Sequence, residues 1–234
     1  MNSNNFVEHK FGLVLKTDRH LVAFCNGSVD FDQLAELWPN LSFVKLRQIH
    51  SAKCLEIGSL KQTLPPPSAD AQFTQVTGLG LAVQTADCMP ILFVSPYQVA
   101  TIHAGWRGLV MNVIGNTLKT FANRKELAAY FGPHILSRSF EVGADVAEQI
   151  LSFGNRYQNE NNKHLLDRCC LEHADPSKRY IDLQAIALAQ LIDFGLRPNQ
   201  VQLATCDTLT SLNWESYRRD RSKAKRNLSF CALL

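Results

Sequence analysis

The stretch between residues 79 and 103 constrains the fold more than any other part of the chain. It holds three short apolar runs in quick succession, separated by a bend at 87–90 and a turn at 95–98. Runs of this length bounded by turn residues are typical of β-strands rather than helices. The predicted strands cover residues 79–85, 89–94 and 99–103.

Directly after these strands, the pattern changes from that of a strand to that of a helix. Apolar residues recur at i, i+3, i+4, i+7, i+8 and i+11 across 110–121, which predicts one amphipathic helix. Another helix is predicted over 182–194, with Asp182 as its N-cap. This alternation of strands and helices indicates an α/β (α+β) fold. The remaining predicted elements are strands at 41–49, 126–131, 139–142 and 201–205, and a helix at 145–151.

Length and composition favour a single folded unit. The chain has 234 residues, of which 46% are apolar and 19% are charged, as in a globular protein rather than a disordered one. The irregular stretches at 65–67 and 155–163 are too short to mark a domain boundary. We therefore expect one domain over residues 1–234.

Charge and leader patterns limit the classes of partner. A net charge of +3 is too small to indicate a nucleic-acid-binding protein. No apolar run approaches the roughly 18 residues of a membrane span, and the first residues lack a signal-peptide pattern. The seven cysteines include no CxxC pair, as is typical of a reducing compartment. We expect a cytoplasmic protein that acts on a small molecule, without a membrane or nucleic-acid partner.

Unusual polar residues gather at the ends of the predicted strands, where functional sites are usually built. His50, Cys88 and His103 come from three separate strand ends. This set fits a catalytic zinc site with an open position better than a structural site, which uses closely spaced ligand pairs. Spacing leaves other interpretations open: ordinary packed side chains, Cys88 as a hydrolase nucleophile, or a copper site with Met89 as the axial ligand.

Two further segments are candidates for binding an anion. Gly105 to Gly108 leads into the predicted helix, so free backbone N–H groups and the Arg107 guanidinium form a good anion seat. The alternative is a tight turn with a solvated Arg107. Residues 217–226 carry six basic side chains, which is typical of a solvated loop. One or two of these arginines could instead fold back onto a phosphate.

Taken together, the motifs resemble the YfiH/laccase-domain family over roughly residues 41–231. The motifs are Arg47-Gln48-Ile49-His50, Ala69-Asp70-Ala71, Thr85-Ala86-Asp87-Cys88-Met89-Pro90, His103-Ala104-Gly105-Trp106-Arg107-Gly108, Phe131-Gly132-Pro133, Glu141-Val142-Gly143 and Ser216-Tyr217-Arg218-Arg219-Asp220. The resemblance implies mixed β-sheets sandwiched between helices, similar to a cysteine-hydrolase fold. It also implies that His50, Cys88 and His103 are the metal ligands.

Members of that family are described as zinc-dependent purine nucleoside enzymes. They cleave adenosine, inosine, guanosine or methylthioadenosine with phosphate, and they deaminate adenosine. The resemblance therefore implies zinc, with copper less favoured, and a purine nucleoside and phosphate as substrates. We expect Asp87 to act in catalysis beside the metal ligands. The residues expected to bind substrate or phosphate are Gln48, Asp70, Arg107 and Arg219.

Three other functions remain open at this stage. The first is an amidase acting on a peptidoglycan precursor, with the metal or Cys88 as its reactive group. The second is a copper-dependent polyphenol oxidase, and the third is a non-enzymatic protein with a structural metal. The sequence also departs from the family pattern near the expected substrate site, at Ser51, His134, Asp207 and Ala224-Lys225.

Overall fold

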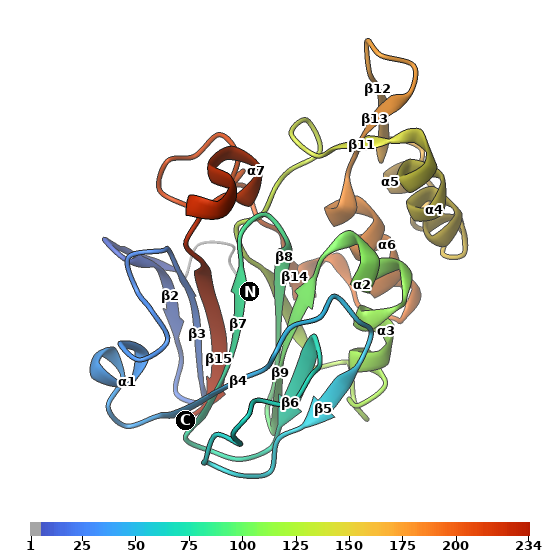
Figure 1. Ribbon diagram of the computed structural model, residues 1–234. Helices are drawn as coiled ribbons and strands as arrows, with labels where there is room; N and C mark the ends of the chain where they lie inside the picture. The colour runs from blue at the N-terminus through green and yellow to red at the C-terminus, as the bar shows by residue number, and fades with distance from the viewer. Residues whose placement is uncertain (1–5) are drawn as a thin grey trace.

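Two six-stranded mixed sheets form the centre of the computed structural model, which describes residues 6–234 (Figure 1). The first sheet has the order β1-β2-β3-β15-β7-β4 and the second β14-β10-β8-β9-β6-β5. The strands of the first sheet are β1 (Val7–His9), β2 (Gly12–Lys16), β3 (His20–Cys25), β4 (Ser42–Lys45), β7 (Leu79–Thr85) and β15 (Asn227–Leu233). Those of the second are β5 (Cys54–Glu56), β6 (Ala71–Thr74), β8 (Met89–Ser95), β9 (Gln98–Ala104), β10 (Ala128–Phe131) and β14 (Val201–Gln202).

Helices and a small third sheet complete the molecule. The third sheet has the order β11-β13-β12 and projects beyond the helices in Figure 1. Its strands are β11 (Glu141–Gly143), β12 (Cys170–Glu172) and β13 (Lys178–Ile181). The helices are α1 (Leu34–Leu37), α2 (Trp106–Val110), α3 (Val113–Leu118), α4 (Ala144–Asn155), α5 (Lys163–Leu166), α6 (Leu183–Asp193) and α7 (Tyr217–Asp220). None of the helices in the described part of the chain has the length and apolarity needed to cross a bilayer.

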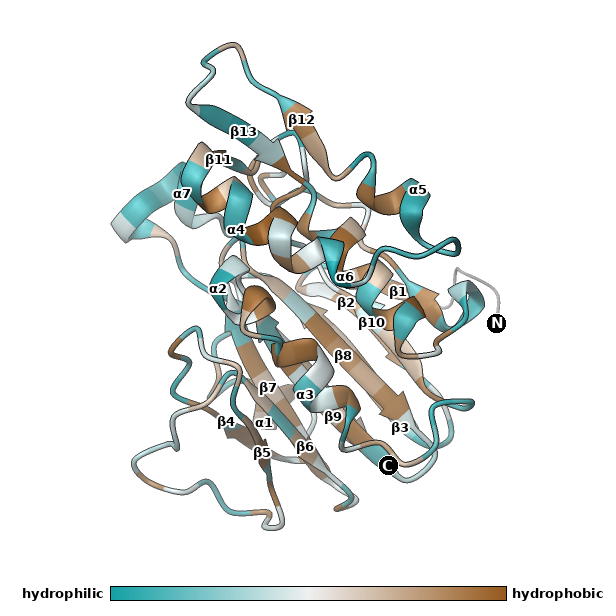
Figure 2. Ribbon diagram, turned by 90° about the vertical axis from the view of Figure 1, so that its right-hand side faces the viewer, coloured by the Kyte–Doolittle hydropathy of each residue, from teal (hydrophilic) through white to brown (hydrophobic). Residues whose placement is uncertain are grey.

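The central strands of each large sheet are buried on both faces, and alternate residues of a strand point to opposite faces. In β15, Cys231 and Leu233 pack between the two sheets, whereas Phe230 packs on the outer face with α1. In β8, Leu92 faces the first sheet, and Phe93 faces the core under the helices. Figure 2 shows the mainly apolar strand β8 beside helices α3 and α6. The expected sandwich of mixed sheets between helices is therefore confirmed.

The strands expected at 79–85, 89–94 and 99–103 are confirmed, and β7 has the predicted bounds. The N-cap is also confirmed, because the Asp182 carboxylate accepts a hydrogen bond of 2.9 Å from Ala185 N. Helix α6 ends at Asp193, one residue before the predicted end at 194. Pro90 stands inside β8 rather than in a bend, and it pairs in register with His103.

The single helix predicted over 110–121 is wrong. The chain forms α2 and α3, which are separated by Asn112 with a left-handed φ of 75°. The Asn112 side-chain oxygen accepts hydrogen bonds from Gln190 Nε2 and Tyr157 Oη, which hold the break in place. Ile114 and Leu118 are nevertheless fully buried, so the periodicity correctly predicted which face is buried.

The strand predicted over 41–49 is wrong beyond Lys45, where β4 ends. His50 has a φ of 58°, which an extended strand does not adopt. The chain leaves the sheet because the backbone N–H groups of residues 49–51 turn toward a buried carboxylate. This turn begins the functional site.

Candidate metal centre

Asp70 organises the loop that carries His50. Its carboxylate is fully buried and accepts hydrogen bonds from the backbone N–H groups of Ile49, His50 and Ser51, the last at 2.6 Å. The Ser51 hydroxyl donates a further bond of 2.8 Å. A carboxylate satisfied by this many donors holds the loop in one conformation. Its full burial places Asp70 behind the site, and it lines neither of the pockets described below.

Asp70 also orients His103 in β9. The His103 Nδ1 atom lies 2.8 Å from Asp70 Oδ1. With Nδ1 donating to the carboxylate, Nε2 carries the lone pair that can bind a metal. One buried acid thus positions two histidines from separate parts of the chain.

Cys88 lies between β7 and β8, next to Asp87, whose backbone has a φ of 86°. Its Sγ atom is 3.9 Å from His50 Nε2. The ligand atoms of His50, Cys88 and His103 all lie within 4.8 Å of one another. Within residues 6–234, this is the one group of three or more His, Cys, Asp or Glu side chains that could hold a metal ion.

The donor set fits zinc. Tetrahedral zinc, with Zn–S of about 2.3 Å and Zn–N of about 2.0 Å, places sulfur and nitrogen about 3.6 Å apart. The distance of 3.9 Å between Cys88 Sγ and His50 Nε2 is within a few tenths of that value. Two imidazoles and a thiolate leave a fourth position open, as catalytic zinc sites require.

The two histidines lower the pKa of the Cys88 thiol, which favours metal binding. Burial raises the pKa of the Cys88 thiol, but hydrogen bonds with His103 and His50 outweigh this effect and lower the pKa below its usual value. Burial raises the pKa of Cys25, and it also raises that of Cys231 in spite of a hydrogen bond to the Ala100 carbonyl. Burial also lowers the pKa of His103, but its bonds to Asp70 and Cys88 raise it overall. Cys88 therefore favours the thiolate that binds metals.

Two pockets meet at the cluster. The larger, of about 490 Å³, is lined by Gln48, Gln84 and Arg226. The smaller, of about 250 Å³, is lined by Arg107 and by residues of the C-terminal segment 217–226, among them Arg218 and Arg221. The residues common to both are His50, Ala86, Cys88 and Tyr217. Both pockets therefore give access to His50 and Cys88 of the cluster.

Among the residues predicted from sequence, Gln48 lies in the larger pocket. Its side-chain amide donates to the Gln84 carbonyl at 2.7 Å and accepts from the Gln84 N–H at 2.8 Å. Asp87 lies in the smaller pocket, where its carboxylate accepts bonds of 2.8 Å from Thr208 Oγ1 and 2.6 Å from Arg218 N. Asp87 thus attaches the start of α7 to the site.

Arg107 and Arg219 lie in different surroundings. Arg107 is exposed, lines the smaller pocket and places its guanidinium 4.6 Å from the Trp106 ring. Arg219 lines neither pocket. Its guanidinium donates to the carbonyls of Thr208, Ser211 and Trp214 and pairs with Asp220 at 2.7 Å. Arg219 therefore holds the loop that precedes α7 through hydrogen bonds to its backbone carbonyls.

Sequence reasoning did not single out several residues that line the site. Arg218 and Arg221 face the smaller pocket, and Tyr217 borders both pockets. The basic run at 217–226 was the signal for them, since it suggested that some of its arginines fold back. Which of these arginines line the pocket depends on the register of β15, in which Asn227 pairs with Thr85 at the end of β7.

The positions at which the sequence departs from the family pattern support the site from behind. Ser51 bonds to Asp70 through both its N–H and its hydroxyl. His134 is buried, forms a backbone bridge with Asp207 and bonds through Nδ1 to the Gly132 carbonyl at 2.9 Å. None of these residues lines either pocket.

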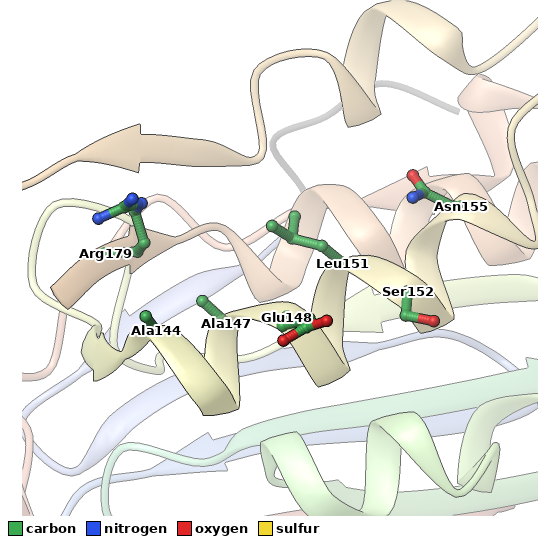
Figure 3. Close-up of a pocket in the computed structure, with 7 residues that line it drawn as sticks. All are labelled: Ala144, Ala147, Glu148, Leu151, Ser152, Asn155 and Arg179. Carbon is green, nitrogen blue, oxygen red and sulfur yellow. The ribbon is translucent and has the colours of Figure 1, made fainter. Parts of the chain in front are cut away.

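A separate pocket of about 380 Å³ runs along α4 (Figure 3). Glu148 and Arg179 are its charged lining residues, and it contains none of the residues predicted to act in catalysis or binding. The predicted chemistry is therefore concentrated at the His50–Cys88–His103 cluster.

Comparisons with known proteins agree with this architecture. Residues 30–234 match the family described as multi-copper polyphenol oxidoreductase laccase. A purine nucleoside phosphorylase of Xylella fastidiosa (strain 9a5c) is 32% identical over 187 residues, covering 77% of this chain and 68% of that protein. The purine nucleoside phosphorylase YfiH of Shigella flexneri is 32% identical over 188 residues, covering 78% and 70%.

Solved structures share the fold. The hypothetical protein YfiH of Bacillus licheniformis superposes with a TM-score of 0.84, covering 99% of this chain and 100% of that one at 18% identity. YlmD from Geobacillus stearothermophilus gives 0.83, covering 98% of each at 19% identity. Together with the sequence match, this likeness shows that the chain belongs to the YfiH/laccase-domain family.

Proposed function

We propose that this protein is a zinc-dependent purine nucleoside phosphorylase that cleaves adenosine, inosine, guanosine or methylthioadenosine with inorganic phosphate. The observation that carries the proposal is a candidate metal-ligand cluster that borders two pockets, both of which are lined by arginines. The names of the Xylella and Shigella relatives support the same class of substrate.

In this reaction the C1′–N9 bond of the nucleoside breaks, a phosphate oxygen bonds to C1′, and the departing purine takes up one proton. Arg107 and Arg218 supply fixed positive charge for the phosphate oxygens. Asp87 positions Arg218, because its carboxylate accepts the Arg218 backbone N–H. His50, Cys88 and His103 would hold the zinc, which would supply a Lewis acid at this point of the site.

Deamination of adenosine is a second activity proposed for the same site. It replaces the 6-amino group of the purine with oxygen from water and releases ammonia. The open position left by the three ligands, next to a pocket large enough for a nucleoside, supports this activity. Deamination also needs a group that transfers protons from the water to the leaving amine. Asp70 is unsuited to this transfer because it is fully buried and lines neither pocket.

Zinc is proposed over copper on the chemistry of the site. A blue-copper centre needs a weak axial ligand such as methionine, yet Met89 packs in the core under the helices and lines neither pocket. Oxidation of phenols by a multi-copper enzyme needs several copper ions, whereas residues 6–234 provide one candidate cluster.

The test is metal content combined with an adenosine assay, with and without phosphate. We expect one zinc per chain and phosphate-dependent formation of adenine and ribose 1-phosphate, both lost in Cys88→Ala. Cys170→Ala is the matched control, because Cys170 is a free cysteine in β12 that lines neither pocket. Zinc without any turnover of nucleosides would refute the phosphorylase. Amide hydrolysis that survives chelation would instead identify Cys88 as a nucleophile.

A further inference from the structure

We propose that the smaller pocket is the phosphate site and the larger pocket holds the nucleoside, so that the two substrates reach the cluster from opposite sides. This inference rests on the proposed phosphorylase function and assigns anion binding to Arg218 and Arg221 together with Arg107. The three guanidinium groups come from two distant segments of the chain and line one pocket of about 250 Å³.

The guanidinium groups of the smaller pocket favour an anion. The larger pocket is also lined by two arginines, but Arg47 donates to Ser68 and Arg226 donates to two backbone carbonyls. Asp87 is the acidic side chain in the lining of the smaller pocket, and both Asp87 oxygens already accept hydrogen bonds from Thr208 and Arg218. Within residues 6–234, the guanidiniums of Arg107 and Arg221 form no hydrogen bond and no ion pair with protein acids. Their donors are therefore available to phosphate oxygens, which guanidinium groups bind in a bidentate manner.

Aromatic rings hold two of these arginines rather than a purine. The Arg107 guanidinium lies 4.6 Å from the Trp106 ring, and that of Arg218 lies 5.4 Å from the Phe140 ring. Arg218 also donates a hydrogen bond of 2.7 Å to the Glu141 carbonyl. Side chains held in this way lose less conformational freedom when an anion binds. One face of the Trp106 ring and one face of the Phe140 ring are therefore occupied by guanidinium groups.

Backbone strain is concentrated at the same pocket. Four non-glycine residues between 6 and 234 have positive φ, and three of them, His50, Asp87 and Arg221, line the smaller pocket. Arg221 combines a φ of 55° with a ψ of −127°, a conformation that glycine adopts far more readily. Strain of this kind clusters at binding and catalytic sites. An arginine at this position is thus explained by what its side chain binds.

The larger pocket suits a nucleoside. Its volume of about 490 Å³ lies within the range of about 300–1,000 Å³ usual for organic ligands, whereas the smaller pocket falls below it. The two bonds between the Gln48 side-chain amide and the Gln84 backbone fix both residues in place. The side chain of Gln84 also lines this pocket. Amides of this kind can pair with the polar edge of a purine or with ribose hydroxyls.

The test uses Arg221→Gly in the zinc-loaded full chain, because glycine relieves the backbone strain while removing the guanidinium. We expect KM for phosphate to rise at least about tenfold, as for the loss of one charge-assisted hydrogen bond. KM for adenosine should stay within about twofold, and the Tm of the variant without phosphate should equal or exceed that of the wild-type protein. Lys223→Gln is the matched control, because Lys223 is exposed in the same 3-10 turn and lines neither pocket.

Three outcomes would overturn the assignment. A rise in KM for adenosine alone would place the nucleoside in the smaller pocket. An equal rise in KM for phosphate in Lys223→Gln would show a diffuse effect of charge. An unchanged KM for phosphate in Arg221→Gly would exclude Arg221 from the site.

A binding measurement separates this proposal from the phosphorylase itself. Inorganic phosphate should raise the Tm of the wild-type protein relative to chloride at the same ionic strength, without any nucleoside, and Arg221→Gly should reduce the increase. If this result holds while no nucleoside is turned over, the anion site stands and the phosphorylase fails. If nucleosides are cleaved but phosphate shifts the Tm of both proteins equally, the anion site fails and the phosphorylase stands.

Discussion

Replacing Asp70 with asparagine tests whether one buried carboxylate organises the metal centre. Asp70 Oδ1 accepts from His50 N at 2.9 Å and His103 Nδ1 at 2.8 Å. Asp70 Oδ2 accepts from Ser51 N at 2.6 Å. An asparagine has one acceptor oxygen, so its NH₂ group must face one of these donors. The less costly orientation keeps the oxygen toward the histidines and leaves the Ser51 N–H without a partner.

The expected cost follows from these contacts. Losing a hydrogen bond to a charged acceptor costs about 1.5–3 kcal/mol, and leaving a buried N–H unsatisfied costs about 1–3 kcal/mol. We therefore expect Asp70→Asn to lower the free energy of unfolding of the metal-free protein by about 3–5 kcal/mol. Zinc affinity should fall by about 10–100-fold, because His103 loses the partner that fixes its tautomer.

The assays are urea unfolding of the metal-free protein and zinc titration in competition with a chelating dye. Asp145→Asn is the control, because Asp145 is an exposed acid in the first turn of α4. Ser51→Ala, which removes one hydroxyl bond to the same carboxylate, should cost about 1.5–3 kcal/mol, less than Asp70→Asn. Wild-type stability and zinc affinity in Asp70→Asn would refute the view that this carboxylate organises the site.

Three further predictions concern the same region. In Gly105→Ala, the new Cβ would lie 3.0 Å from Cys88 Sγ and 3.1 Å from His50 Cδ2, so dye competition should show zinc affinity reduced about tenfold while the metal-free Tm changes little. Arg219→Gln should lower the free energy of unfolding by about 2–3 kcal/mol, measured in urea, and leave KM for phosphate unchanged; the reverse result would make Arg219 a phosphate ligand. Burial raises the pKa of Asp70, but its bonds to His103 and Ser51 lower it from 3.8 to about 2. Its contribution of about 2 kcal/mol is present above pH 4 and is lost as the pH falls toward 2, and an acid titration of Asp70→Asn should lack it.

The buried strands and two members of the candidate metal cluster, Cys88 and His103, could be placed from the sequence because each lies in or beside an apolar strand. The apolar run of β7 ends at Thr85, and Cys88 follows within three residues. His103 is itself a strand residue, so its position follows from the strand. The break at Asn112 could not be predicted, since it depends on Gln190 and Tyr157, which lie far along the chain.

The burial of Asp70 could not be predicted for the same reason. It stands between two alanines and was expected to bind substrate or phosphate, and the chain buries it completely. Its donors are the N–H groups of the His50 loop and the imidazole of His103, which are brought together only when β6 pairs with β9. A buried carboxylate is stable only with such donors, so the burial of Asp70 depends on the conformation of the His50 loop and on the position of His103.

The arginines of the C-terminal segment show how a charge run acquires a function through sheet register. β15 lies between β3 and β7, and the pairing of Asn227 with Thr85 brings the preceding residues beside the 86–88 turn. A slip of β15 by one residue would reverse the faces of its side chains, moving Phe230 from the outer core to the inner one. Packing of the apolar strand thus excludes a one-residue slip and the shifted positions of Arg218 and Arg221 that would follow from it. The hydrophobic core of the first sheet therefore determines which guanidinium groups reach the cluster.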